Sequence, residues 1–540
     1  MLQRDVLAGI TVAAVALPLA LAFGVAGGAT AAAGMVTAIL AGLLIAGLGG
    51  ASFQLSGPTG AMSAVLIVVA QRYGMGGVWV ASLLAGVALV LLGVFRLGRS
   101  VSFIPAPVIT GFTSGIALII AVGQIDNVLG VKTPAAESAL GQLWQVVSHP
   151  PVPDWRTLAI AGIVALVMIG LPRLTTAAPG SLVGIILATM VALLFGWQVP
   201  QIGSIPQTIL LDQRLTWGAI PWANLGDLVP PAISIAALGA IESLLCGSVG
   251  ATMAGKPIHS DQELIGQGIG NIVIPFFGGV PATAAIARTS VGIKSGGVTR
   301  LVSFVHSIAL LLSVFALGPL IGRIPLAALG GVLMVTAWRM NEWESIRFFV
   351  RTRMKHALAG MMITMVATAA LDLSQAIIIG VALSAVLYLR QSAVSTTVTR
   401  APVNLERLLA QGHDLPAHGP KVHVYYLTGP IFFGSVATVL SALEDDCSDV
   451  LVISMRGVPM IDATGAHALT QIVEMQHQRG GQVYFSGVQP AVQTMFRRSG
   501  LLTVVGEHNM FWSADRAIVA AYGAAPRAEL REPRGATSAV

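Results

Sequence analysis

The sequence predicts an all-α polytopic membrane protein with a small cytoplasmic α/β domain at its C-terminal end. Three observations lead to this prediction. Only 10% of the 540 residues are charged, against about 25% in soluble globular chains, and the mean hydropathy is +0.81. The apolar residues form repeated runs, and about 20 residues suffice for a helix to cross about 30 Å of hydrocarbon. Beyond residue 400 the sequence becomes mixed and typical of a soluble domain.

The membrane part contains fourteen candidate spanning segments. The first has a minimal charged start, no clear cleavage site and an internal Pro18, so we interpret it as a spanning segment and not as a signal peptide. The segments lie near residues 6–26, 33–50, 58–71, 78–95, 103–125, 157–171, 180–197, 230–250, 262–278, 282–294, 301–320, 325–338, 356–371 and 374–390.

The third and tenth segments are short and interrupted, and they predict an inverted repeat. They read GPTGAMSAVLIVVA and PATAAIARTSVGI, and they hold matching positions in two halves of seven segments each. Matched, interrupted segments in two halves are typical of transporters whose binding site lies between the breaks. We therefore expect a 7+7 inverted repeat with a site at those breaks.

The distribution of Lys and Arg predicts the orientation in the membrane. With the N-terminus in the cytoplasm, about 14 basic residues fall in inside loops and 5 in outside loops, which is the bias found in membrane proteins. The inside residues are Arg4, Arg96, Arg99, Arg173, Lys256, Lys294, Arg300, Arg339, Arg347, Arg351, Arg353, Lys355, Arg390 and Arg400, and the outside residues are Arg72, Lys132, Arg156, Arg214 and Arg323. We expect a multi-pass protein of the inner (plasma) membrane with both termini in the cytoplasm. The basic, amphipathic stretch 339–355 is expected to lie along the inner surface of the bilayer.

The C-terminal region predicts a partly parallel sheet. KVHVYYLTG, DVLVISMRG and GQVYFSGV are β-rich runs, and helical stretches separate them. The predicted division is a transmembrane domain at 1–395, a linker at 396–417, an α/β domain at 418–525 and a disordered tail at 526–540, which is rich in Pro, Arg and Ala.

Two charged residues stand alone in apolar segments. Glu242 lies in ISIAALGAIESLLCGSVGA, and Arg288 follows a Gly-Gly-Val-Pro break. Charged groups at membrane depth are costly, so both are functional candidates. The alternative is structural: the two side chains form an ion pair, or Arg288 ties helices together through backbone carbonyl groups.

Four stretches together resemble the SulP anion transporters, the bacterial relatives of the animal SLC26 group. They are ALPLALAFGVAGG, LSGPTGAMSAV, DQELIGQGIGNIVIPFFGGVPATAAIARTSVGIKSGG and, in the C-terminal domain, VPMIDATGAHAL, which resembles a STAS domain. The resemblance implies a core (transport) domain that moves against a gate (scaffold) domain in an elevator-like cycle. It also implies a homodimer and a secondary active anion transporter, not an enzyme.

The interrupted segments are suited to hold an anion. Helix N-termini present free N–H groups and about half a positive charge, and two such termini are expected near residues 57–61 and 283–286. The predicted substrate-binding residues are Phe23, Thr59, Gly60, Ala285, Ile286 and Arg288. Phe23 enters this set through the resemblance, which implies an aromatic wall there. Plain helix packing also explains Thr59 and the small residues when the resemblance is set aside.

Glu242 and Cys246 are the predicted ion-coupling residues. The resemblance places Glu242 where sodium-coupled bicarbonate relatives carry an aspartate, with a threonine one turn later. Here Cys246 takes the threonine's place, and a thiol is a poor ligand for a hard cation. We therefore favour proton-coupled uptake of a dicarboxylate such as fumarate, or of sulfate. A sodium-coupled bicarbonate transporter and an uncoupled anion uniporter remain the alternatives, and a nucleobase permease or a non-transporting STAS anchor ranks lower.

The STAS-like motif contains Asp462 and Thr464. Soluble relatives that act as phospho-switches carry the phosphoacceptor serine directly after the aspartate, where this chain has Ala463. Thr464 is a substitute acceptor or a helix N-cap, and Asp462 is expected to cap the following helix. The domain is interpreted as a dimer-forming or regulatory module with a cytoplasmic partner.

No cofactor, metal or nucleic acid is expected. Cys246 and Cys447 fall in different domains, which excludes a disulfide framework or a cysteine cluster. His259, Asp261 and Glu263 resemble a metal triplet by composition, but their spacing favours hydrogen bonding and helix capping.

Overall fold

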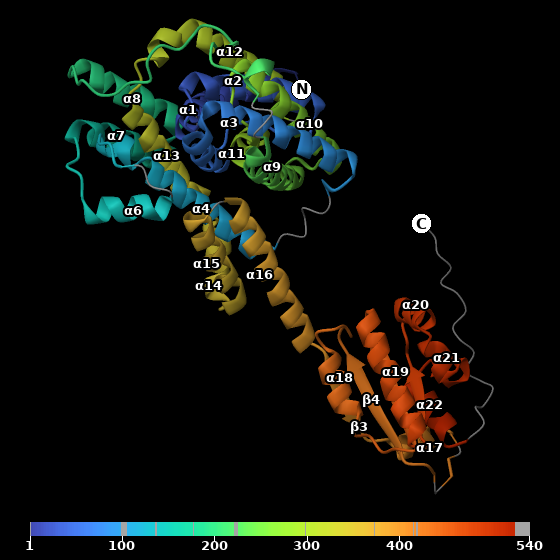
Figure 1. Cartoon of the computed structure of the whole chain (residues 1–540). Coiled ribbons are helices and arrows are strands. Elements are labelled where there is room, and N and C mark those ends of the chain that lie inside the picture. Colours follow the sequence, from blue (N-terminus) through green and yellow to red (C-terminus); the bar gives the residue numbers. More distant parts are fainter. Residues whose placement is uncertain are drawn as a thin grey trace. The chain divides into compact units, whose positions relative to one another are not determined.

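The computed structural model describes residues 2–98, 105–134, 138–175, 178–220, 225–297, 299–371, 373–413, 415–416 and 419–523. The chain divides into two compact units, Met1–Leu383 and Ser384–Val540 (Figure 1). The predicted tail at 526–540 lies outside the described residues.

The first unit consists mainly of helices, as the sequence predicts. Seven helices in the described part of the chain are long and apolar enough to cross a membrane. The helices are α1 (Leu2–Ala26), α2 (Ala31–Leu48), α3 (Gly60–Val94), α4 (Ala106–Gly123), α5 (Ile125–Leu129), α6 (Ala139–Ser148), α7 (Trp155–Leu174), α8 (Gly180–Leu194), α9 (Leu225–Ala254), α10 (Ser260–Val273), α11 (Ile286–Lys294), α12 (Leu301–Ile321), α13 (Leu326–Met340), α14 (Trp343–Arg351), α15 (Lys355–Ala370) and α16 (Leu373–Val394), with short 3-10 helices η2 (Trp217–Ala219) and η4 (Ile274–Phe277).

Each predicted spanning segment overlaps a helix, but the third and fourth segments join in α3. The break between them is a single residue, Gly74, with φ 68° and ψ −179°. Residues with a side chain rarely adopt such a φ, whereas glycine does so at little cost. No atom lies within 4 Å of the position that a Cβ would take at Gly74. The glycine is therefore required by the backbone conformation and not by crowding.

Two very short strands connect the interrupted helices. β1 (Ser56–Gly57) pairs antiparallel with β2 (Thr283–Ala284), with Ser56 opposite Ala284 and Gly57 opposite Thr283. α3 begins at Gly60 and α11 at Ile286, directly after these strands. The pairing therefore holds the first turns of two helices, more than 200 residues apart in the sequence, next to each other. We call this place, where β1 and β2 pair just before α3 and α11, the α3–α11 crossing.

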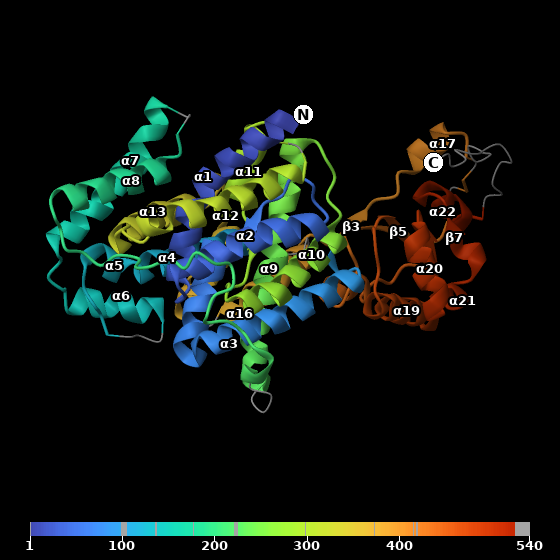
Figure 2. The ribbon, with the colours of Figure 1, turned by 90° about the horizontal axis from the view of Figure 1, so that it is seen from above.

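The helices around this crossing pack closely through small residues. A Cβ at Gly34 of α2 would collide with the carbonyl oxygen of Ala20 in α1, and small residues of this kind let membrane helices approach each other. α10 contacts α2, α3 and α9, and α1 contacts α2 and α12 (Figure 2).

The second unit is a five-stranded sheet covered by helices, which confirms the predicted small α/β domain. The strand order is β3-β4-β5-β6-β7; β3 pairs antiparallel with β4, and the other pairs are parallel. The strands are β3 (Thr397–Ala401), β4 (Val422–Thr428), β5 (Val450–Gly457), β6 (Gln482–Ser486) and β7 (Met510–Phe511), and the helices are α17 (Leu405–Ala410), α18 (Val436–Leu443), α19 (Ala463–Gln478), α20 (Pro490–Ser499), α21 (Leu501–Val505), η5 (Glu507–Asn509) and α22 (Ala514–Ala521).

The central strand β5 is buried on both faces. Leu451 and Ile453 join an apolar cluster with residues of α18 and α19, whereas Val450 and Val452 join a second cluster with Leu408 and residues of α22. Continuous apolar runs are expected for parallel strands that helices cover on both sides. The predicted linker at 396–417 includes β3 and α17, which belong to this sheet and its second apolar cluster.

Candidate functional site

The N-terminus of α3 carries two of the predicted site residues, Thr59 and Gly60, and contacts a third, Phe23 of α1. Thr59 is its N-cap, and the Thr59 hydroxyl accepts a hydrogen bond from the Met62 N–H at 3.3 Å. A Cβ at Gly60 would lie 2.7 Å from Cδ1 of Ile120 and 3.0 Å from Cε1 of Phe23. The structure therefore brings Phe23, Thr59 and Gly60 together and leaves no room for a side chain at Gly60.

The N-terminus of α11 is open. Its N-cap is Ala285, and no side chain caps its first turn. The Ala285 N–H donates to the carbonyl of Leu55 at 2.9 Å, which fixes this end to the segment before β1. Ile286 is 42% exposed. An uncapped helix end with an accessible first turn offers N–H groups to an anion.

Arg288 lies in the first turn of α11 and contacts the segment before α3. Its side chain is 1% exposed, and Nη2 donates to the carbonyl oxygen of Pro58, just before the α3 cap. Its Nη1 lies against Gly57, and Nε and Nη1 have no hydrogen-bond partner among the described residues. Unpaired buried donors of a charged group are rare. The contact with Pro58 is the tie to a backbone carbonyl that the structural alternative describes, and Nε and Nη1 are left without a partner among the described residues.

Glu242 contacts the α3 cap. Its Oε2 accepts a hydrogen bond from the Thr59 hydroxyl at 3.0 Å, and its side chain is only partly buried. The carboxylate is thus bonded to Thr59, so the structural alternative of a direct ion pair with Arg288 is not what the contacts show.

Cys246, one turn later on α9, contacts the other interrupted helix. The Cys246 thiol donates to the Thr289 hydroxyl at 3.3 Å, and this hydroxyl also accepts the Leu55 N–H at 3.1 Å. α9 therefore contacts both helices of the site, α3 through Glu242 and α11 through Cys246.

Further polar residues at the crossing do not appear in the set predicted from the sequence. Ser243 lies within 2.9 Å of the Thr283 hydroxyl, and the Ser63 hydroxyl donates to the Phe23 carbonyl at 2.8 Å. Thr289, Gln267 and Asn271 contact the segments that form the crossing. In the sequence these residues stand out only as polar residues inside apolar or glycine-rich segments. The fold is needed to show which of them reach the site.

His259, Asp261 and Glu263, whose spacing favours hydrogen bonding over a metal site, lie at the start of α10. No group of His, Cys, Asp and Glu side chains in the described ranges has the arrangement to hold a metal ion. Glu263 is buried and accepts backbone N–H groups, whereas His259 and Asp261 line a cavity of about 620 Å³ beside the N-terminus of α10. That cavity shares no lining residue with the α3–α11 crossing.

In the second unit, Asp462 caps α19. Its carboxylate accepts the Gly465 N–H at 2.7 Å and the Phe433 N–H at 3.1 Å, so the cap predicted from the sequence is confirmed. Ala463 and Thr464 are exposed in the first turn of α19.

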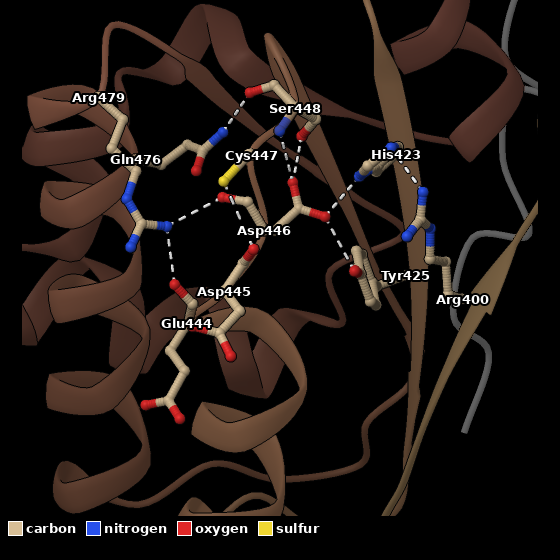
Figure 3. Close-up of polar contacts among 10 residues, drawn as sticks. All are labelled: Arg400, His423, Tyr425, Glu444, Asp445, Asp446, Cys447, Ser448, Gln476 and Arg479. Carbon is tan, nitrogen blue, oxygen red and sulfur yellow. Dashed lines mark hydrogen bonds and ion pairs between the residues drawn. The ribbon is translucent and has the colours of Figure 1, made fainter.

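A buried polar cluster around Asp446 lies near the first residues of β4 and β5 (Figure 3), whereas Asp462 follows the last residue of β5. Its carboxylate accepts hydrogen bonds from His423, Tyr425 and Ser448. Burial favours a higher pKa for Asp446, but these hydrogen bonds outweigh it and hold the pKa below its ordinary value. Burial and the neighbouring carboxylate raise the pKa of Tyr425 to about 12. The cluster therefore keeps Asp446 ionised and Tyr425 neutral at physiological pH.

Comparisons with known families agree with this architecture. Residues 2–367 match the model of the sulfate permease family, and residues 417–517 match that of the STAS domain.

Two curated relatives are similar over almost the full chain. The chain is 32% identical to YvdB of Bacillus subtilis over 94% of this chain and 96% of YvdB, whose name assigns it to the sulfate transporters. It is 29% identical to the bicarbonate transporter BicA of Picosynechococcus over 96% of this chain and 94% of BicA.

Solved structures show the same fold. The structure of SLC26A9 covers 97% of this chain, and 90% of that chain is matched, with a TM-score of 0.86 at 16% identity. The transmembrane domain of a cyanobacterial BicA covers 70% of this chain, and 97% of that chain is matched, with a TM-score of 0.64 at 30% identity.

Proposed function

Because the chain belongs to the sulfate permease (SulP/SLC26) family of anion transporters and carries a STAS domain, we propose that it is a secondary active transporter that couples uptake of a small anion to protons. The favoured substrates are sulfate and small dicarboxylates such as fumarate.

The anion is held between the N-termini of α3 and α11. The observation that carries this proposal is the pairing of β1 with β2, which brings the two helix ends together beside Arg288, whose Nε and Nη1 have no hydrogen-bond partner among the described residues. Phe23 and Gly60 shape one wall, Thr59 offers a hydroxyl, and the N–H groups after Ala285 offer backbone donors. Two helix ends and one guanidinium supply positive potential without a flexible lysine.

The proton acts at Glu242. An ionised Glu242 accepts a hydrogen bond from the Thr59 hydroxyl, so this hydroxyl cannot donate to an anion. A protonated Glu242 donates to Thr59 instead, which turns the hydroxyl proton toward the site and removes a negative charge next to the substrate. Binding of the proton and binding of the anion thereby favour each other.

A sodium-coupled bicarbonate transporter is the second candidate, because the chain is 29% identical to a bicarbonate transporter along nearly its whole length. The thiol of Cys246 supports the proton over the sodium ion, since sodium, like other hard cations, takes oxygen ligands.

The transporter works in the inner membrane as a homodimer, with an elevator-like movement of the core domain against the gate domain. Both termini face the cytoplasm, which the excess of about 14 inside over 5 outside basic residues supports. The transport domain extends over residues 1–395, and the STAS domain is a regulatory module with a cytoplasmic partner.

Uptake by purified protein in liposomes tests the function. Labelled sulfate, fumarate, succinate and bicarbonate are each supplied with an inward proton gradient, with an inward sodium gradient and with neither. We expect accumulation of sulfate or a dicarboxylate under the proton gradient. Accumulation driven by sodium favours the second candidate, and flux that ignores both gradients identifies a uniporter.

A further inference from the structure

One face of α10 carries a stripe of buried polar side chains. Glu263, Gln267 and Asn271 are spaced by four residues, which places them above one another on a helix. Each is at most 1% exposed. Buried polar groups destabilise a fold unless they find partners, so the partners of this α10 stripe indicate what it does.

Asn271 binds the segment that leads into α11. Its Nδ2 donates to the Ala282 carbonyl at 2.9 Å, and its Oδ1 accepts the Ala282 N–H at 2.8 Å. Both backbone groups of the residue before β2 are therefore held by one side chain.

Gln267 and Glu263 bind the segment that leads into α3. Gln267 Nε2 donates to the Ser56 hydroxyl in β1 at 2.8 Å and to Glu263 Oε1 at 3.1 Å. Glu263 Oε2 accepts the N–H groups of Gly50 at 2.9 Å and Ala51 at 3.2 Å. Three successive turns of one face of α10 therefore form hydrogen bonds with both segments of the crossing.

We propose that the α10 stripe sets the separation and register of the two helix N-termini, and thereby determines which anion fits between them. Glu263, Gln267 and Asn271 are positioning residues in this account: they bond β1, β2 and the segments before them, while the predicted ligand contacts come from Thr59, Ala285 and their neighbours. The inference rests on the proposed anion site. Release of one segment lets one helix end shift against the other, and small displacements of a preorganised site weaken binding strongly.

Uptake kinetics of the full-length protein in liposomes test the inference. Asn271→Ala frees the α11 side, and Gln267→Leu and Ser56→Ala free the α3 side. We expect each change to raise KM about tenfold or more, to reduce kcat less, and to narrow the difference in KM between sulfate and fumarate. Because Gln267 and Ser56 act through one hydrogen bond, the double variant should be no worse than the more affected single variant.

Ser82→Ala is the matched control. The Ser82 hydroxyl donates to the Asn271 carbonyl at 3.0 Å, so this variant also loses a buried hydrogen bond to α10, but not one to the crossing. It should lower thermal stability about as much as Ser56→Ala and leave KM and anion preference unchanged. Hydrogen exchange over residues 50–58 and 280–286 should accelerate in Asn271→Ala, Gln267→Leu and Ser56→Ala but not in Ser82→Ala.

The outcomes separate the two proposals. Wild-type protein that takes up none of the anions contradicts the proposed function. If the wild-type protein takes up an anion, unchanged KM and unchanged hydrogen exchange in Gln267→Leu and Ser56→Ala contradict the positioning role. An increase in KM and in hydrogen exchange that is equally large in Ser82→Ala also contradicts it. If Asn271→Ala cannot be purified, the α3-side variants decide the question alone.

Discussion

At the scale of single residues, Thr59 joins two helices of the site, α3 and α9. Its hydroxyl accepts a hydrogen bond from Met62 and donates one to Glu242, so one side chain caps α3 and contacts the residue that is proposed to couple the proton. The same hydroxyl faces the helix end that is proposed to bind the anion. We therefore expect a change at this position to affect helix stability, the proposed anion binding and the proposed proton coupling together.

Thr59→Val keeps the shape of the side chain and removes its hydroxyl. We expect KM to rise about tenfold, as for the loss of a hydrogen bond with a charged partner, and the loss of the cap to cost about 1 kcal/mol of stability. Thr59→Ser retains the hydroxyl and should restore both. Uptake kinetics and thermal unfolding measure the two effects, and a Val variant with wild-type KM would contradict the role of the hydroxyl.

Asp446 gives the second unit a pH-dependent stability. Its pKa is held below the ordinary 3.8, so the folded state prefers the ionised form. The resulting contribution of Asp446 to the free energy of unfolding is fully present above the ordinary pKa and is lost as the pH falls through the lower, folded-state pKa. We expect Asp446→Asn to lower the unfolding temperature of the second unit at pH 7 and to lose this difference as the pH falls below about 4. A difference that stays constant down to pH 3 would be inconsistent with this linkage.

The interrupted helices were predictable at the scale of elements, because Gly and Pro mark their starts at Gly57, Pro58 and Pro281. The cap at Asp462 was also predicted from residue type and position, whereas Thr59 was predicted only as a binding residue and caps α3 in the structure. The bonding of Glu242 to Thr59 was not predictable, since opposite charges at similar depth favour an ion pair with Arg288 in the absence of coordinates. The α10 stripe shows the same limit: its spacing is visible in the sequence, but its partners lie more than 200 residues away on the α3 side.

Gly74 offers a test of the break in α3. Gly74→Ala places a side chain at φ 68°, which we expect to destabilise the protein by about 1 kcal/mol or more. Gly76→Ala is the control, because Gly76 lies in the same helix, has open space around it and adopts no positive φ. Thermal unfolding in detergent compares the two. Equal stability of both variants would show that the break does not depend on the backbone of Gly74.

The orientation belongs to the scale of the whole molecule, and the native cysteines report on it. Cys246 is buried and Cys447 is exposed. If the STAS domain is cytoplasmic, a membrane-impermeant maleimide should label Cys447 in inside-out vesicles and not in intact spheroplasts. Cys447→Ser, which leaves Cys246 in place, is the control and should abolish the labelling. Labelling of intact spheroplasts would contradict the proposed topology.

The proton-coupled mechanism is the central claim, and Glu242→Gln tests it most directly. The glutamine keeps the size of the side chain and a hydrogen bond with Thr59 but cannot exchange a proton. In liposomes loaded with a pH-sensitive dye, addition of the transported anion to wild-type protein should acidify the interior while the anion accumulates. Glu242→Gln should carry the anion down its own gradient without acidification and without accumulation under a proton gradient. Proton-driven accumulation by Glu242→Gln at the wild-type level would contradict the account.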